Sequence, residues 1–250
     1  MAGRKSPSAG RARGKGLRSR LARRPNLDVG FIGIGNMGCP MAVNLLKRGK
    51  SIRLHVPVGR DAKANLQRLT KAGNVVFHER FDDLAAAVEV CFTMLPMPTD
   101  VESVILREGG LIRGLRKGAM VIDCSTSSAE LARRIDESLQ VVGCAALDSP
   151  VSGSPVRAES GTLSLMVGGR REAYEGVRPL LECLGTPTYM GPSGSGQITK
   201  SINQIIVGLV MAAVGEGIIL GRKAGIDLQA MLDAVGGGLA GTEVMRIKGP

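Results

Sequence analysis

Residues 29–46, VGFIGIGNMGCPMAVNLL, form the segment that decides the fold. A short apolar run, Val29–Ile34, ends in glycines, as a strand does before a tight turn. The residues after it have helical spacing, with Met37, Met41 and Leu45 on one stripe. The segment therefore predicts a strand, a glycine-rich turn and a helix in direct succession.

The turn has the spacing Gly33-x-Gly35-x-x-Gly38. In a dinucleotide-binding turn the first glycine permits the bend and the second lets the backbone approach a pyrophosphate. The third lets the helix pack closely on the strand. The helix N-terminus then offers free N–H groups to the phosphates. We therefore predict a dinucleotide site formed by Gly33, Ile34, Gly35, Asn36, Met37 and Gly38.

Strand and helix patterns alternate from this turn to about residue 190. Alternation of this kind requires crossover connections, so it predicts an α/β fold with a doubly wound parallel sheet. After Tyr189 the strand patterns stop, and residues 197–245 have the pattern of helices. We place a Rossmann-like dinucleotide-binding domain at residues 27–190 and a partial all-α domain at residues 191–250. The expected strands are 52–56, 75–77, 88–95, 120–123, 141–147 and 163–167, and the expected helices are 62–72, 82–87, 128–139 and 172–184.

The first 26 residues differ from the rest of the chain. They contain nine basic residues and no acid, with many Gly, Ser and Pro residues, so we expect a disordered basic tail. This composition is also compatible with a mitochondrial transit peptide; otherwise we expect a cytoplasmic protein. Without these nine charges the net charge of +11 falls to +2. A nearly neutral body argues against nucleic-acid binding, which needs a basic face.

The five cysteines have no zinc or redox spacing, and we interpret them as buried thiols in a reducing compartment. We therefore expect no metal site. The longest uncharged run, residues 201–215, contains polar residues and is shorter than the ~20 apolar residues of a membrane span. We therefore expect no membrane partner.

The cofactor's ribose is normally bound by an acidic residue about 20 residues after the glycine turn. No acid occurs between Lys50 and Arg60 in this chain. Without that carboxylate nothing repels the 2′-phosphate of NADP, and Arg60 or Arg53 could pair with it. Between NADP and NAD we favour NADP.

Polar residues follow two later strands and open the last helical region. The sequence VIDCSTSS places Ser125 and Thr126 at the end of one strand, and LDSPVSGS forms a Ser-Gly turn after another. Such turns can direct successive N–H groups at an anion, for example a carboxylate. Lys200 then opens an uncharged apolar stretch, and Asn203 shares its helix face. Because the only two histidines lie in the early half of the sheet, Lys200 is the candidate general acid/base.

In this order the motifs resemble those of the β-hydroxyacid dehydrogenases, a family that includes 3-hydroxyisobutyrate dehydrogenase and tartronate semialdehyde reductase. The resemblance covers residues 29–250. It implies a Rossmann domain joined by a long helix to an all-helical domain, and an NAD(P)-dependent interconversion of a small β-hydroxyacid and its semialdehyde. The ending GGLAGTEV and the pair Asn203-Gln204 favour the tartronate semialdehyde reductase branch. The motifs are the glycine turn, TMLP (93–96), DCST (123–126), SPVSGS (149–154), GTLSLMVGG (161–169) and GSGQITKSINQ (194–204).

The resemblance also implies roles for single residues. Lys200 matches the catalytic lysine of the family, and Asn203 matches an asparagine that contacts the substrate. Three positions match contacts to the substrate carboxylate: Ser125, Ser152 and Gly153. Three further positions match residues that line the cofactor: Leu95, Pro96 and Thr126.

Two departures from the family pattern are visible. The family has Gly-Gly where this chain has Gly153-Ser154, and family members continue beyond residue 250 through helices that include a second lysine. We therefore expect a C-terminally truncated chain or an incomplete cleft.

Two other functions remain open at this point, together with the state of association. One is a catalytically impaired relative that binds a dinucleotide or docks its tail on nucleic acid or chromatin. The other is an imine reductase, which would be expected to lack the lysine. The apolar face from Ile205 to Val214 predicts a homo-oligomer.

Overall fold

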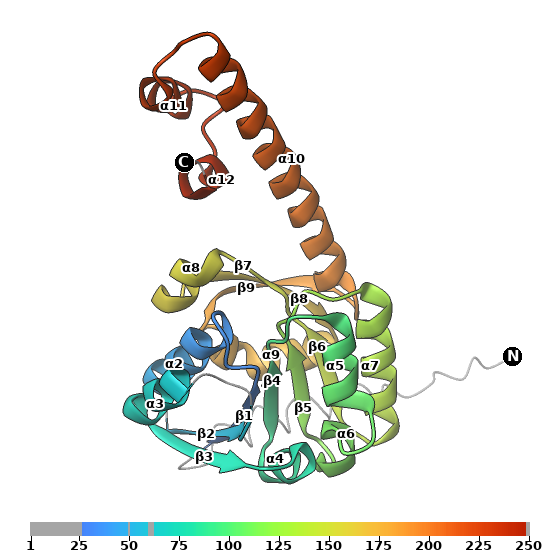
Figure 1. The fold of residues 1–250 in the computed structure, drawn as a ribbon. Helices are drawn as coiled ribbons and strands as arrows, with labels where there is room; N and C mark the ends of the chain where they lie inside the picture. Colours follow the sequence, from blue (N-terminus) through green and yellow to red (C-terminus); the bar gives the residue numbers. More distant parts are fainter. Residues whose placement is uncertain (1–26, 50, 60–62, 249–250) are drawn as a thin grey trace, which may run out of the picture. The chain divides into compact units, whose positions relative to one another are not determined.

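The computed structural model describes residues 27–49, 51–59 and 63–248 (Figure 1). The basic tail expected at residues 1–26 lies outside this range, and so does Arg60. The chain divides into two compact units, a first that ends at Lys200 and a second that begins at Ser201. The boundary expected from the sequence, between residues 190 and 191, lies ten residues earlier.

The first unit is built on one mostly parallel sheet with the strand order β3-β2-β1-β4-β5-β6-β8-β7, and β9 pairs with β8. The strands from β1 to β6 are parallel, whereas β8 runs antiparallel to β6. The doubly wound α/β fold is confirmed, with an antiparallel edge that the sequence patterns did not predict. The strands are β1 (Leu27–Ile32), β2 (Ile52–Pro57), β3 (Asn74–His78), β4 (Val90–Thr93), β5 (Met120–Asp123), β6 (Ala145–Asp148), β7 (Val151–Ser152), β8 (Leu163–Gly169) and β9 (Gly185–Gly191).

Helices cover both faces of this sheet, and the alternation of side chains along each strand explains why (Figure 1). In β1, Val29 and Phe31 point into one apolar cluster, while Ile32 points into the other. The helices of the first unit are α2 (Gly38–Arg48), α3 (Lys63–Ala72), α4 (Phe81–Ala87), α5 (Pro98–Leu106), α6 (Leu111–Gly114), α7 (Ala129–Val141), α8 (Ser154–Ser160) and α9 (Arg171–Leu181).

One predicted strand begins at the wrong residue. Residues 141–147 were expected to be extended, but α7 continues to Val141 and β6 begins at Ala145. Val141 is 87% exposed at the end of the helix, and Gly143 makes the turn with φ 76°. A short apolar run does not by itself distinguish a helix end from a strand. The helices α5, α6 and α8 and the strands β7 and β9 were also missing from the prediction.

The second unit is helical, as expected for this part of the chain. It contains most of α10 (Ser195–Lys223), then α11 (Leu228–Gly236) and α12 (Glu243–Lys248). Asp227 caps α11, since its carboxylate accepts the Ala230 N–H at 2.8 Å. With an 18-residue window of mean hydropathy 2.0, α10 is long and apolar enough to cross a membrane by length and composition. A single helix of this kind is weak evidence of a membrane span, because apolar helices of other proteins meet the same criteria.

Candidate active site

The glycine turn lies between β1 and α2, where the strand order reverses and open α/β sheets bind their ligands. Gly33 has φ 90°, and a Cβ there would lie 2.2 Å from the Met94 carbonyl oxygen. A Cβ on Gly38 would lie 1.8 Å from the Gly33 carbonyl oxygen. These two glycines are therefore required by the protein's own packing.

Gly35 is different, because a Cβ at this position would meet nothing within 4 Å. The space beside it is open, which fits close approach of a pyrophosphate. The N-terminus of α2 has no acid in its first turn and no side-chain cap. Its N–H groups are thus not taken up by a capping side chain, and the local charge suits an anion. The residues present therefore fit a dinucleotide.

A neighbouring helix fixes the shape of this turn. Asn65 of α3 donates from Nδ2 to the Ile34 carbonyl oxygen at 2.8 Å, while the Ile34 side chain is fully buried. Ile34 can therefore contribute only its backbone to a ligand, whereas Gly35 and Asn36 are exposed and Met37 is half-buried. The sequence patterns did not identify Asn65, because a bond from a side chain to a distant backbone carbonyl has no periodic signature.

The ends of β4 and β5 are tied together beneath the site. The Asp123 carboxylate accepts hydrogen bonds from the Thr93 hydroxyl at 2.8 Å and the Ser125 N–H at 3.1 Å. Complete burial raises the pKa of Asp123 to about 6, and these hydrogen bonds oppose the shift. The Ser125 hydroxyl is itself buried and accepts the Leu95 N–H at 2.9 Å. In this structure the Ser125 side chain holds the Leu95 segment, while Thr126 and Pro96 are exposed at the same edge of the sheet.

Lys200 lies in the second turn of α10 and is only 8% exposed. Its Nζ donates to the Val151 carbonyl oxygen at 2.8 Å, which places the ammonium beside Ser152. Burial lowers the pKa of Lys200 from its ordinary value. No carboxylate in the described part of the chain forms an ion pair with it. The structure thus brings Lys200 and Ser152 together at one point.

The Ser-Gly turn after β7 has an unusual backbone. Gly153 has φ 139°, and Ser154 has φ 61°, in the left-handed region that favours glycine. The Ser154 hydroxyl is buried without a hydrogen-bond partner. Ser154 therefore occupies a position that a glycine would fit better, and the family has Gly-Gly at this turn.

Two further predicted residues have other contacts in this structure. Asn203 falls in the second unit, three residues after Lys200 along α10, and its Nδ2 donates to the Gln204 side chain at 3.0 Å. Arg53 forms a bidentate pair with Asp28 at 2.6 and 3.0 Å, and Asp28 also bonds His55. Arg53 is thus held at the beginning of β2, whereas the glycine turn follows the end of the neighbouring strand β1.

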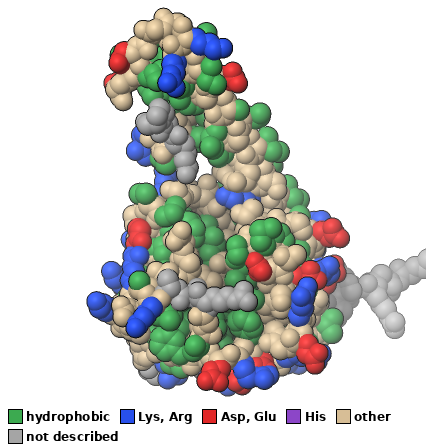
Figure 2. All heavy atoms as spheres, viewed as in Figure 1, with side chains coloured by type: hydrophobic (Ala, Val, Ile, Leu, Met, Phe, Trp, Pro, Cys, Tyr) green, Lys and Arg blue, Asp and Glu red, His purple; other side chains and the backbone are tan. Residues whose placement is uncertain are grey.

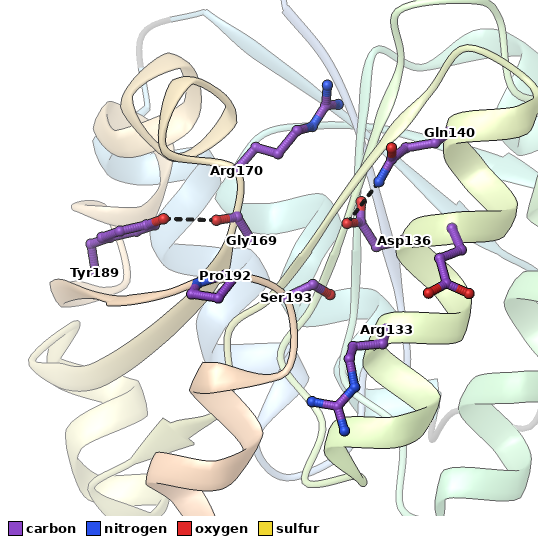
Figure 3. Close-up of a pocket in the computed structure, with 9 residues that line it drawn as sticks. Arg133, Asp136, Gln140, Gly169, Arg170, Tyr189, Pro192 and Ser193 are labelled. Atoms are coloured by element: carbon purple, nitrogen blue, oxygen red, sulfur yellow. Dashed lines mark hydrogen bonds between the residues drawn. The ribbon is translucent and has the colours of Figure 1, made fainter.

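A cavity of about 440 Å³ lies elsewhere in the first unit, between α7, the end of β8 and the segment before α10 (Figure 3). It contains none of the predicted site residues. Two arginines and two acids among its lining residues balance in charge: Arg133, Arg170, Asp136 and Glu137. Gln140 donates to Asp136 at 2.9 Å, and the Tyr189 hydroxyl donates to the Gly169 carbonyl oxygen at 2.9 Å. The cavity therefore has no charge preference for a dinucleotide.

The described residues contain no group of three His, Cys, Asp or Glu side chains that could hold a metal ion. All five cysteines are free and buried, and burial raises the pKa of the Cys144 and Cys183 thiols. The interpretation of the cysteines as buried thiols is confirmed.

Two family models cover the described chain. Residues 28–194 match the NAD-binding domain of 6-phosphogluconate dehydrogenase. Residues 194–250 match the NAD-binding region of NADP-dependent 3-hydroxyisobutyrate dehydrogenase. The chain belongs to the β-hydroxyacid dehydrogenase family. It is thus an NAD(P)-dependent oxidoreductase that acts on a CH–OH group, and the expected family is confirmed.

Individual relatives agree with this assignment. The 2-hydroxy-3-oxopropionate reductase of Escherichia coli is 37% identical, over 89% of this chain and 75% of the relative. An Arabidopsis thaliana protein named probable 3-hydroxyisobutyrate dehydrogenase-like 2, mitochondrial, is 36% identical, over 88% of this chain and 72% of the relative. The structure of Mycobacterium tuberculosis 3-hydroxyisobutyrate dehydrogenase with L-serine has a TM-score of 0.73 at 28% identity, covering 88% of this chain and 73% of that one.

Proposed function

We propose that this dehydrogenase interconverts a small β-hydroxyacid and its semialdehyde with Lys200 as the general acid/base. The observation that carries the proposal is the position of the Lys200 ammonium, buried and bonded to the Val151 carbonyl beside Ser152. An ammonium has three donors, and the Val151 carbonyl occupies one of them. The remaining donors are available to a substrate oxygen.

The bound nicotinamide supplies the hydride in reduction and accepts it in oxidation. In reduction, the Lys200 ammonium gives a proton to the aldehyde oxygen as the carbonyl carbon gains the hydride, which leaves an alcohol and a neutral amine. In oxidation, the neutral amine takes the proton of the alcohol. Burial lowers the pKa of Lys200, so the neutral amine that oxidation needs forms more readily than in an exposed lysine.

Substrate and cofactor contacts complete the proposal. The turn at Ser152 and Gly153 receives the substrate carboxylate, with Ser125 and Asn203 as further contacts. We propose tartronate semialdehyde as the substrate, since the 2-hydroxy-3-oxopropionate reductase of Escherichia coli is among the similar relatives. We propose NADP as the preferred form of the cofactor, held at Gly33–Gly38 with Leu95, Pro96 and Thr126, and with Arg60 on its 2′-phosphate.

We also propose that the enzyme is a homo-oligomer in the cytoplasm. A mitochondrial location is the alternative, because the name of an Arabidopsis thaliana relative describes it as mitochondrial. The apolar side chains exposed on α10 support association, because soluble monomers rarely expose many large apolar side chains on one element (Figure 2).

The test of the proposed function replaces Lys200 by Met, which keeps the length and removes the proton. General acid–base groups contribute about 10²–10⁴-fold in rate, so kcat with tartronate semialdehyde and with 3-hydroxyisobutyrate should fall by that factor. The affinity for NADPH should stay close to that of the parent. Lys71→Met on the exposed side of α3 is the matched control and should leave kcat unchanged. Parental kcat in Lys200→Met would refute the role of Lys200.

A further inference from the structure

The first turn of α10, which directly precedes Lys200, is bound to the sheet by one carboxylate. Asp148, at the end of β6, is 3% exposed. Its Oδ1 accepts the Gly194 N–H at 2.8 Å and its Oδ2 accepts the Gln197 N–H at 3.0 Å. Both oxygens thus bind backbone donors that a helix N-terminus otherwise leaves unpaired.

Two glycines make room for this carboxylate. A Cβ on Gly168 would lie 2.5 Å from Asp148 Oδ1, and a Cβ on Gly196 would lie 2.8 Å from Oδ2. The same Cβ on Gly196 would lie 2.3 Å from the Met166 carbonyl oxygen. The start of α10 therefore packs directly on the backbones of β6 and β8, and its position has little freedom.

Gln197 connects the same turn to the segment after β5. Its side chain is 1% exposed. Its Oε1 accepts the Ser127 N–H at 2.9 Å, and its Nε2 donates to the Ser125 carbonyl oxygen at 2.9 Å. One amide thus holds both neighbours of Thr126, which the proposed function places against the cofactor.

Gln197 and Lys200 are three residues apart on α10, so they share one face of the helix. The Ser125–Ser127 segment and the lysine are consequently fixed to the same turn. We infer that Asp148 and Gln197 are positioning residues that hold Lys200 in register with the cofactor-lining segment. The inference rests on the proposed function of Lys200 and adds two residues to it.

The distance between Lys200 and the reacting atoms depends on these bonds. A displacement of about 1 Å in a reacting group can cost about 10²-fold in rate. Release of the first turn would also admit water to Lys200, and its pKa would return toward its ordinary value because burial is what lowers it.

The variant Gln197→Met tests the inference, because it keeps the length of the side chain and removes its polar contacts with Ser125 and Ser127. We expect kcat to fall by about 10–10²-fold. The rate of oxidation should rise with pH as Lys200 loses its proton, and this limb of the pH profile should move to higher pH. The NADPH dissociation constant should stay within about threefold of that of the parent. Gln67→Met, at an exposed position of α3, is the matched control.

A second variant guards against a simple loss of folding. Gln197→Glu keeps the acceptor for the Ser127 N–H, while its second oxygen faces the Ser125 carbonyl without a proton to donate. Because this oxygen is buried against another acceptor, the unfolding midpoint should fall below that of the parent. Circular dichroism should nevertheless show a folded protein at the assay temperature, so that a lower kcat and a shifted pH profile report lost positioning and not unfolding.

The outcomes separate the two proposals. Parental kcat and an unmoved limb in both Gln197 variants would overturn the inference. A weaker NADPH affinity with an unmoved limb would also overturn it, since Gln197 would then support only the cofactor. If Lys200→Met, measured in parallel, keeps parental kcat, the proposed function fails; if only the Gln197 variants behave as the parent, the inference alone fails.

Discussion

At the residue scale, Ser154 combines two unfavourable features. Its backbone has φ 61°, which side chains disfavour, and its hydroxyl is buried without a hydrogen-bond partner. Ser154→Gly removes both, so we expect it to raise the free energy of unfolding by about 1 kcal/mol. Urea denaturation measures the change. Ser138→Gly, inside α7, is the control and should lower stability by a similar amount, while a loss of stability in Ser154→Gly would contradict the account.

Also at the residue scale, Asp123 should make the stability of the fold depend on pH. Its folded-state pKa of about 6 lies above the ordinary value of 3.8, so the folded chain binds more protons than the unfolded chain between these values. Its contribution to stability is therefore greatest at low pH and is lost as pH rises through about 6. Asp123→Asn keeps an acceptor for Thr93 and removes this titration.

We expect the variant to gain up to roughly 3 kcal/mol relative to the parent between pH 4 and pH 7. Denaturation series at both pH values measure this difference. Parallel stability curves for the two proteins would show that Asp123 does not titrate in this range.

At the element scale, replacing glycine by alanine should have opposite effects at two positions of the glycine turn. Gly35→Ala adds a methyl group where nothing lies within 4 Å, so the unfolding midpoint should not fall. The methyl group would instead occupy space that the pyrophosphate needs, and NADPH affinity should fall at least about tenfold. Gly38→Ala forces a contact of 1.8 Å with the Gly33 carbonyl and should destabilise the fold by about 1–3 kcal/mol. Titration calorimetry and thermal unfolding separate the two effects, and the reverse pattern would mean that the turn does not bind the cofactor.

Some of these elements could be predicted from the sequence, whereas the contacts between distant segments could not. Periodicity placed β1, α2, β5 and α10, and the glycine spacing gave the turn, because each signal lies within a short window. The contacts of Asn65, Asp148 and Gln197 were missed, since they join segments 31 to 72 residues apart. The left-handed backbone of Ser154 was not predicted either, although the Gly-Gly pattern of the family pointed to it.

At the scale of the whole molecule, the second unit exposes many large apolar side chains on α10. We expect these side chains to be covered by association of chains, so light scattering should give a mass of at least twice that of the monomer. A monodisperse monomer over a wide range of concentrations would contradict this prediction. The exposed set is Ile202, Ile205, Ile206, Leu209, Met211, Ile219 and Leu220.

The central claim is that Lys200 transfers the proton, and the pH dependence of kcat/KM in both directions tests it most directly. Oxidation needs the neutral amine, so its kcat/KM should rise with pH until the pKa of Lys200 is passed; reduction needs the ammonium and should fall over the same range. Because burial lowers this pKa, both limbs should lie below the ordinary lysine value of 10.5. The account predicts that Lys200→Met loses both limbs. If the variant keeps either limb at the parental pH, another group transfers the proton and the account is wrong.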